Sequence, residues 1–458
     1  MAGGLFNQQD KVRPGAYVNV QSQVLNAMAT NETGVVAMPL ELSWGPENEL
    51  IEVTSNLDIF RLLGATFLDP ELSPIGLALN RSNKVITYRL NKGGTKAAID
   101  HEAMTVSAKY TGINGNEIAL RIMPTTLQES SFELRVFFKE ELVEAFYFNQ
   151  WVELGEIASS FIDVTPKAGE SIPETPQGET TLRLEGGTNG TVTATNLFHF
   201  FDLIDEVEFR TLVVAPTTVG DINYEPFYSL AESFIGRRRD EYGSKANLVV
   251  FQNDRNPDKE YVINVYNTVA DRDGKVLTPL EVTAWVAGAT AGAAPSAALT
   301  YDTFPAAIHA LPKSEEELLT NENIIRALNQ GYFVFINKRG SVVVEQDINS
   351  LVTFTEEKNQ DFRKNRIMRV LDFICNDSKQ SFEDNFLGQV DNDRDGRELF
   401  RVDRIRMFSS LQAEGAIQNF TTEDIEVLEG EQKDAVVLNV FVQPTDAMEK
   451  LYMSVLVS

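Results

Sequence analysis

Cysteine and histidine are scarce in this 458-residue sequence, which contains one cysteine and three histidines. A single cysteine excludes a disulfide framework within the chain and fits a reducing compartment. Cys375 falls at helical spacing in "IMRVLDFICND", so we predict a small buried hydrophobic residue rather than a nucleophile. His101 and His309 lack partners at metal-ligand spacing, and His199 stands among phenylalanines, as a hydrogen-bonded helix histidine would.

Long apolar runs and a basic surplus are also missing. No stretch approaches the ~20 apolar residues of a membrane span, and "MAGGLFNQQDKVRPG" lacks the apolar region of a secretory signal. We therefore expect assembly in a cytoplasm and no membrane insertion. The chain has 67 acidic and 40 basic residues, a net charge of −27, which argues against nucleic acid as a partner. The basic run Arg237–Arg239 is either a solvated last helical turn or a docking site for an acidic neighbour.

Catalytic motifs are absent from the sequence. It contains no G-x-S-x-G, Walker A or G-x-G-x-x-G pattern. Residues 391–396, "DNDRDG", match the first half of an EF-hand loop, but Val402 occupies the twelfth position, where a bidentate glutamate is required. We interpret 391–396 as a turn stabilised by Asx and glycine residues. No cofactor, metal or enzymatic activity is expected; an enzyme with an unrecognised site in the α/β region is the alternative.

The order of hydrophobic patterns predicts a multidomain chain that combines α/β and all-β parts. Thr- and Val-rich alternating runs between residues 96 and 193, separated by turns such as "GINGN", predict an inserted β-sandwich. From residue 194 the chain alternates helices with short, strongly apolar strands, which is an α/β pattern. The Gly/Ala-rich segment 286–301 interrupts this pattern. A long helical segment then precedes the final strands.

An isolated strand pattern lies near the start of the chain. Within the Gly-, Gln- and Asn-rich segment 1–33, Ala16, Val18 and Val20 share one face and Tyr17 and Asn19 the other. No compact element surrounds this strand, so we interpret the segment as an extended arm.

A second isolated strand pattern is "KLYMSVLVS" at residues 450–458. Its apolar face contains Leu451, Met453, Val455 and Val457, and Tyr452 lies on the opposite face. An unpaired apolar strand promotes aggregation unless a specific partner covers it. The hairpin predicted at 424–430 and 434–443 would itself need further strands, because a lone hairpin is marginal in water. Its alternating apolar residues are Ile425, Val427, Val436, Leu438, Val440 and Val442.

Several strings along the whole chain give it a family resemblance. They are "KVRPGAYVN", "VTAWVAGATAGAAPSAALTY", "GYFVFINKRGSVVVEQDINSLVTFT", "FRKNRIMRVLDFICNDS", "GQVDNDRDGREL" and "VQPTDAMEKLYMSVLVS". In this order they resemble the tail sheath proteins of contractile bacteriophages and phage-tail-like bacteriocins of Gram-positive hosts. The resemblance implies an arm (1–33), a small N-terminal domain (34–95), an inserted β-sandwich (96–193), a subtilisin-like α/β domain without a triad (194–345), a tube-facing C-terminal α+β domain (346–449) and a donor strand (450–458).

The resemblance also implies a function and partners. Six copies would ring a tail tube in each disc, and discs would stack helically on a baseplate beneath a tail terminator. The sheath would then shorten and widen, driving the tube through the target envelope without a nucleotide. The protein would be found in a virion tail or bacteriocin particle. Alternatives are a sheath from a secretion or toxin-injection system, and a static shell of one fixed geometry.

The terminal strands suggest how copies would join. We hypothesise that the hairpin accepts Ala16–Val20 of one neighbour and Leu451–Val457 of another, forming a four-stranded intermolecular sheet by β-augmentation. The alternative is that Leu451–Val457 folds back on its own hairpin. Basic residues that are candidates for contacting the tube are Lys364, Arg366 and Arg369.

Overall fold

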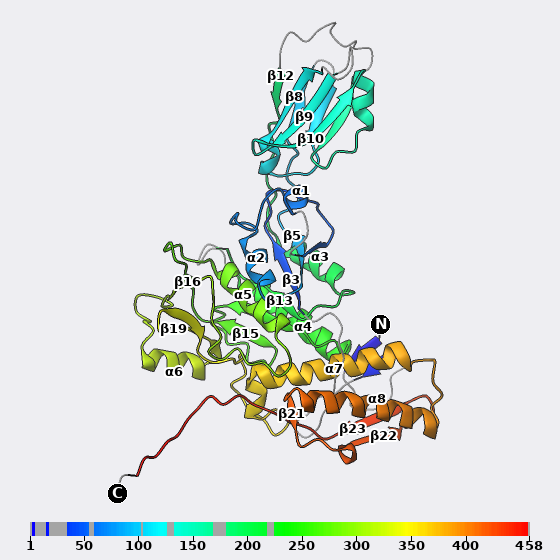
Figure 1. Ribbon diagram of the computed structural model, residues 1–458, viewed down its shortest axis with the longest axis vertical. Helices are drawn as coiled ribbons and strands as arrows, with labels where there is room; N and C mark the ends of the chain where they lie inside the picture. Colours follow the sequence, from blue (N-terminus) through cyan, green and yellow to red (C-terminus); the bar gives the residue numbers. More distant parts are fainter. Residues whose placement is uncertain are drawn as a thin grey trace. The chain divides into compact units, whose positions relative to one another are not determined.

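The computed structural model describes residues 2–4, 15–17, 34–54, 59–101, 104–125, 132–167, 180–217 and 224–456 (Figure 1). Val18, Asn19, Val20 and Val457 of the predicted donor strands lie outside the described residues. The chain forms two compact units. The first comprises residues 1–37, 77–85 and 207–458, and the second comprises residues 38–76 and 86–206.

A largely parallel sheet organises the first unit. Its strand order is β18 (Tyr332–Phe333), β15 (Val262–Val265), β14 (Asn247–Phe251), β13 (Thr211–Val213) and β3 (Val35–Leu40), followed by β5 (Lys84–Arg89) and β4 (Ile51–Val53). The pairs from β18 to β3 are parallel. The chain passes between the two units within β3 and β5, and β4 belongs wholly to the second unit. Apart from Asn247 and Asn264, the central strands β14 and β15 are apolar and buried, as is typical of parallel strands covered on both faces.

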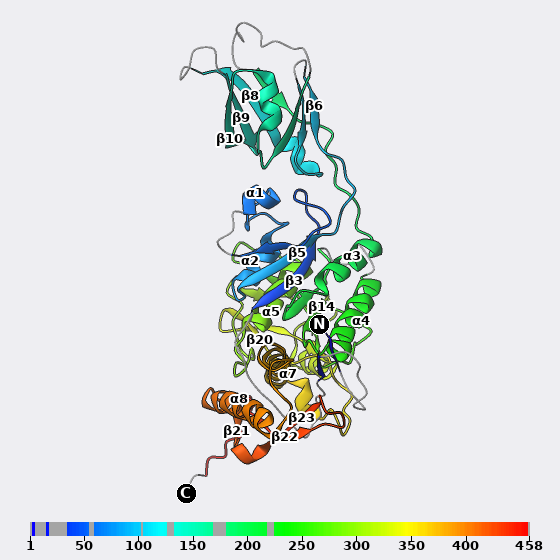
Figure 2. The same ribbon diagram turned by 90° about the vertical axis from the view of Figure 1, so that its right-hand side faces the viewer.

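Helices α4 (Glu225–Glu241) and α5 (Pro279–Gly292) lie on opposite sides of this sheet (Figure 2). Helix α5 occupies part of the Gly/Ala-rich segment 286–301, so the prediction that this segment interrupts the α/β pattern was wrong for residues 286–292. A capping box of Thr278 and Glu281 starts the helix. Its glycines allow close backbone approach: a Cβ on Gly292 would lie 1.6 Å from the carbonyl oxygen of Arg81.

Smaller elements complete the α/β part of the first unit. They are the pair β16 (Val269–Ala270) and β17 (His309–Ala310), the pair β19 (Phe335–Lys338) and β20 (Ser341–Val344), helix α6 (Asn321–Asn329) and helix α2 (Ser73–Leu79), whose last residues belong to this unit.

The C-terminal part of the first unit is built on two long helices. It contains η3 (Gln360–Arg363), α7 (Asn365–Asn385), α8 (Arg394–Ala413), β21 (Ile417–Gln418), η4 (Thr422–Asp424), β22 (Ile425–Glu429), β23 (Val436–Val440) and β24 (Gln443–Pro444). Figure 1 shows α7 and α8 side by side, with the β22–β23 hairpin next to α8. One hydrophobic core joins both helices and the hairpin.

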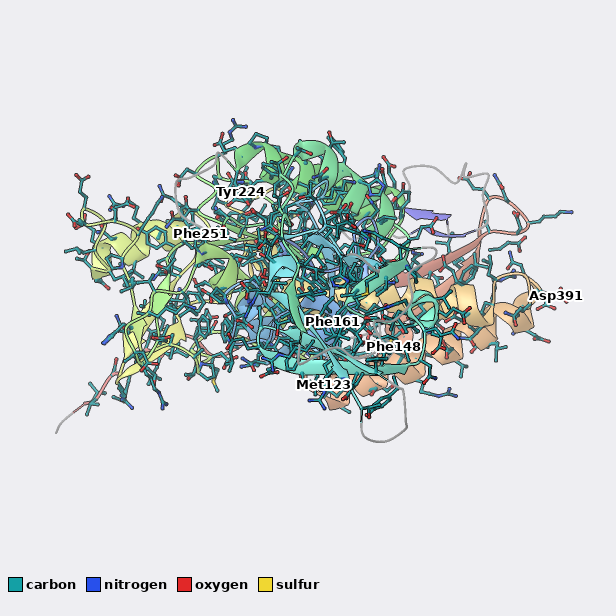
Figure 3. All side chains as sticks on the ribbon, turned by 90° about the horizontal axis from the view of Figure 1, so that it is seen from above. Met123, Phe148, Phe161, Tyr224, Phe251 and Asp391 are labelled. Atoms are coloured by element: carbon teal, nitrogen blue, oxygen red, sulfur yellow. The ribbon has the colours of Figure 1, made fainter. Side chains whose placement is uncertain are left out.

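Two antiparallel sheets enclose the core of the second unit. Their orders are β10 (Glu141–Phe148), β9 (Phe132–Phe138), β8 (Ile118–Pro124), β12 (Thr180–Arg183), and β11 (Ile162–Pro166), β7 (Met104–Ala108), β6 (Ala98–Asp100). Short helices accompany them: α1 (Ile59–Leu63), η1 (Ile113–Glu117), η2 (Trp151–Glu156) and α3 (Ala194–Ile204). Phe148 and Phe161, labelled in Figure 3, lie in this core with Trp44.

The alternating burial of β7 and β9 follows the alternating sequence pattern, because each strand faces the core on one side only. Mixed α/β and all-β parts were therefore correctly predicted at the level of element type. Among the described residues, no helix combines the length and apolarity needed to cross a membrane.

Candidate assembly interface

The C-terminal hairpin pairs β22 with β23 in antiparallel fashion. Ile425 lies opposite Val440, Val427 opposite Leu438, and Glu429 opposite Val436. The side chains of Ile425 and Val440 are buried in the core formed with α7 and α8, and Leu438 packs against that core. Val442 follows β23 and packs there too. One face of the hairpin is therefore anchored to its own chain.

The two edges of this hairpin differ in how they are covered. Hydrogen bonds from Phe441 N to Asp424 O (2.7 Å) and from Gly430 N to Ala435 O (2.8 Å) mark pairs that bond across the hairpin. Because antiparallel pairs alternate, the backbone groups of the residues between them point away from the partner strand. On β22, Arg401 Nε donates to the outward carbonyl of Ile425 at 3.1 Å.

On β23, the outward residues are Val436, Leu438 and Val440. Within the described part of the chain, their outward backbone groups form no hydrogen bond. A row of unpaired N–H and C=O groups is the feature that an added strand recognises. The edge of β23 is therefore the candidate acceptor.

Helix α8 is attached to α7 beneath the hairpin by a buried ion pair. Arg404 Nη1 donates to Asp377 at 2.8 Å, and Arg404 Nε donates to Asp403 at 3.1 Å. Burial raises the pKa of Asp377 to about 7; Arg404 opposes this shift and the Asp403 carboxylate adds to it. Two carboxylates thus share one buried guanidinium.

This arrangement predicts an unusual pH dependence for Asp377→Asn. The folded pKa of Asp377 is about 7 against an ordinary 3.8, so the folded chain binds this proton more tightly than the unfolded chain. The contribution of Asp377 to stability is then full below its ordinary pKa and is lost as pH rises towards about 7. The stability of the Asn variant relative to the natural protein should increase from about pH 4 to about pH 7 in urea unfolding. A relative decrease over that range would contradict the raised pKa.

Helix α7 is joined to α4 through a second buried ion pair. Arg239 donates to both carboxylate oxygens of Asp372, at 2.9 and 2.6 Å. The side chain of Asn376 bonds the backbone N and O of Lys245, at 2.6 and 2.9 Å. Helices α4, α7 and α8 are thereby connected through buried polar contacts.

The prediction made for the basic run at the end of α4, residues 237–239, was partly wrong. Arg238 and Arg239 are only 2% and 5% exposed, so the interpretation as a solvated helical turn was wrong for these two residues, although Arg237 is exposed. Arg238 stacks on Phe209, with 4.7 Å between the guanidinium carbon and the ring centroid. The acidic neighbour of Arg239 is Asp372 of the same chain.

The candidate C-terminal donor strand is exposed. After β24 pairs with β21, and Thr445 N bonds Ala416 O at 2.9 Å, no described residue from 446 to 456 belongs to a strand. Leu451 and Tyr452 are 87% and 89% exposed, and Met453 and Val455 more than 70%. Figure 1 shows this segment leading away from the hairpin. The described residues 451–456 thus do not fold back to pair with the hairpin of their own chain.

Just before this segment, Glu449 is tightly held. Its carboxylate accepts hydrogen bonds from Thr300 Oγ1 at 2.8 Å, from Gln346 Nε2 at 2.7 Å and from Lys364 Nζ. Lys364 also pairs with Asp446 at 3.3 Å. We call this group of five residues the clasp. Sequence reasoning missed Glu449, because its partners lie 85 to 149 residues away and no local motif indicates them.

The N-terminal candidate strand occupies a different place. β2 (Gly15–Tyr17) pairs in parallel with β1 (Ala2–Gly4), which places Ala16 opposite Gly3 and Tyr17 opposite Gly4. β2 lies beside α7 and β1 beside α4. Within one chain, the described part of this segment is therefore paired away from the hairpin.

Among the tube-contact candidates, Arg369 was a wrong prediction. It is 4% exposed, pairs with Asp347 at 3.3 Å and donates to the carbonyl of Ala297 at 2.6 Å, so it does not present its charge to a partner. Lys364 belongs to the clasp, and Arg366 is half-buried, with Nη2 at 3.4 Å from the carbonyl of Gly415.

The remaining chemistry-bearing residues have structural roles. Asp393 caps α8 by accepting from Gly396 N at 2.8 Å, while Asp391 projects outward in the preceding loop (Figure 3). No cluster of three potential metal ligands occurs among the residues that the structure describes. His199 hydrogen-bonds Tyr88 at 3.1 Å. Cys375 is buried as predicted, and burial raises its pKa to about 11.

Comparisons with known proteins match the whole chain. Three family models apply: the tail sheath protein Gp18 domain III N-terminal region at residues 33–90, the phage tail sheath protein central domain at 190–350 and the phage tail sheath C-terminal domain at 357–458. The phage-like element PBSX protein XkdK of Bacillus subtilis is 32% identical, over 99% of both chains.

Solved structures agree with these matches. The crystal structure of a sheath tail protein from Desulfitobacterium hafniense is similar with a TM-score of 0.80 and 33% identity, covering 96% of this chain and 99% of that one. One from Listeria innocua has a TM-score of 0.78 and 31% identity, covering 93% and 95%. The contracted helical sheath of the anti-feeding prophage, at 13% identity and a TM-score of 0.57 over 97% and 99%, shares the fold alone.

Proposed function

Because this chain belongs to the phage tail sheath protein family, a structural family of phage and phage-like particles and not of enzymes, we propose that it polymerises as stacked hexameric rings around a tail tube and contracts to drive that tube through an envelope. The observation that carries the proposal is the exposed apolar segment at 451–456 in a chain that also has an open strand edge at β23. Among the residues that the structure describes, the segment lacks a neighbouring strand, and the edge of β23 has backbone N–H and C=O groups without hydrogen-bond partners, so each can supply what the other lacks.

The subunits are joined by β-augmentation. The acceptor is the hairpin, with β23 as the edge nearest to an incoming strand, and the donors are Ala16–Val20 of one neighbour and Leu451–Val457 of another. A donated strand fills main-chain bonds at Val436, Leu438 and Val440, each contributing roughly 0.5–1.5 kcal/mol net.

During contraction the subunits then change position while the donated strands keep them joined. The buried ion pairs at Asp372 and Asp377 join the α/β part to both long helices, and a shared hydrophobic core joins the hairpin to these helices, while the arms carry the change in subunit position. With no nucleotide consumed, the work comes from subunit interfaces that pack better in the contracted state than in the assembled, metastable one. The partners are other copies of the chain, the tail tube protein, and the baseplate and terminator proteins.

Electron microscopy of the purified protein tests this proposal. We expect ordered hollow tubes, and after mild denaturant treatment a shorter and wider form of the same tubes, because the assembled state is metastable. Discrete particles would contradict polymerisation. Tubes or sheets of one unchanging geometry would support a static shell and contradict contraction.

A further inference from the structure

The clasp is a fixed point in an otherwise exposed segment. Met448 is fully exposed and Leu451 is 87% exposed, whereas the Glu449 side chain retains 12% of its exposure. Three of the partners of Glu449 come from three separate segments of the chain: Thr300, Gln346 and Lys364. Because three segments of the chain converge on Glu449, the position of this residue is fixed more firmly than a single surface contact would fix it.

The bonding of Glu449 is strong for a residue of a terminal segment. A carboxylate that accepts from an ammonium, an amide and a hydroxyl forms charge-assisted bonds, which are about twice as strong as neutral ones. Burial alone would raise the pKa of Glu449, but the bonds from Lys364, Gln346 and Thr300 outweigh it and lower the pKa. Glu449 therefore stays ionised, and bonded, at neutral pH.

The clasp also determines the length of the free segment. The preceding backbone contact is that of Thr445 with Ala416, and beyond Glu449 the described residues 450–456 form no hydrogen bond or ion pair. Without the clasp, residues 446–449 would join the free segment and lengthen it by roughly 13 Å at ~3.3 Å per extended residue. A longer tether whose start is not fixed searches a larger volume and presents its end at a lower effective concentration.

We propose that Glu449, held by Lys364, Gln346 and Thr300, is the positioning residue that fixes where the donor strand leaves the subunit and so directs it to one neighbouring hairpin. This rests on the proposed donor-strand function. The clasp does not touch the acceptor; it acts through the strand that it holds. Its loss should leave the strand competent to pair but should abolish the regular geometry of the polymer.

Limited trypsin digestion of the unassembled full-length chain tests the clasp directly, since Lys450 provides a cleavage site next to Glu449. Lys364→Met removes the cation without altering the sequence around the cleaved bond. We expect cleavage after Lys450 to become about tenfold faster, because proteolysis follows the population of the opened segment. The matched control is Arg366→Met, which removes the same charge two residues further on, in the first turn of α7, and should change the rate less than twofold. Equal rates for Lys364→Met and the natural protein would overturn the proposal.

Assembly of the same variants distinguishes the clasp from the donor strand itself. Glu449→Gln and Lys364→Met should polymerise into tubes of irregular diameter, whereas Arg366→Met should form regular ones. Regular tubes from both clasp variants, despite faster cleavage of Lys364→Met, would overturn the positioning role while leaving the donor strand intact. Tubes from a chain lacking residues 450–458 would instead refute the donor strand, and the trypsin result would still report whether the clasp holds the segment.

Discussion

Deleting residues 450–458 is expected to leave a folded, soluble monomer that no longer polymerises. The described residues 451–456 form no strand and are exposed, so their removal creates no cavity and leaves no buried group without a partner. The truncated chain should keep the unfolding midpoint of the natural protein. It should lose the main-chain bonds to a neighbouring hairpin, worth roughly 0.5–1.5 kcal/mol each and several per joint. Sedimentation and electron microscopy measure both results.

Point variants show whether polymerisation is lost because the strand cannot pair or only because the chain is shorter. Replacing Leu451, Met453 and Val455 with aspartate places charges on the apolar face, which would enter the groove of the acceptor, and should prevent polymerisation. Tyr452→Ser changes the opposite face and is the matched control, for which we expect tubes. Sheath tubes from the deletion variant would refute the donor-strand mechanism, whatever the point variants do.

The second large effect is expected from Asp372→Ala. This change leaves the guanidinium of Arg239 buried without its carboxylate, since Arg239 is 5% exposed and bonds both oxygens of Asp372. Removing one partner of a buried ion pair costs about 3–5 kcal/mol. A folded domain has only about 5–15 kcal/mol of stability in total. We therefore expect a large fall in the midpoint of urea unfolding, measured by circular dichroism. We also expect a poor yield of folded protein.

Two controls show whether an unpaired charge causes this loss. Replacing both partners, as Arg239→Met with Asp372→Leu, removes the charge together with its counterion and should recover most of the stability. Lys96→Met breaks an ion pair with Asp163 that is more than 40% exposed on both sides, and should cost less than about 1 kcal/mol. A loss below about 1 kcal/mol for Asp372→Ala would mean that the pair does not hold α7 to α4.

The sequence by itself determined the features that depend on near neighbours. Alternation at period two marked the C-terminal hairpin, because a strand with one buried face must place apolar residues at every second position. The apolar alternation of residues 450–458 predicts a strand that needs a partner, and this stays a prediction. Helical spacing was enough to predict that Cys375 is buried. The turn predicted at 391–396 was correct only for residues 391–393, because Arg394–Gly396 form the first turn of α8, which Asp393 caps.

Only the tertiary structure decided the features whose partners are distant in the chain. Arg239 reads as a solvated helix end until Asp372, 133 residues away, is brought against it. By sequence alone, segment 286–292 looks like an interruption of the α/β pattern. In the structure it is helical, and Gly292 allows close packing against the backbone of Arg81. Glu449 reads as an ordinary surface acid until Thr300, Gln346 and Lys364 converge on it. In each case other segments of the chain determine the residue's burial and hydrogen bonds. The local sequence does not show which segments folding will bring together.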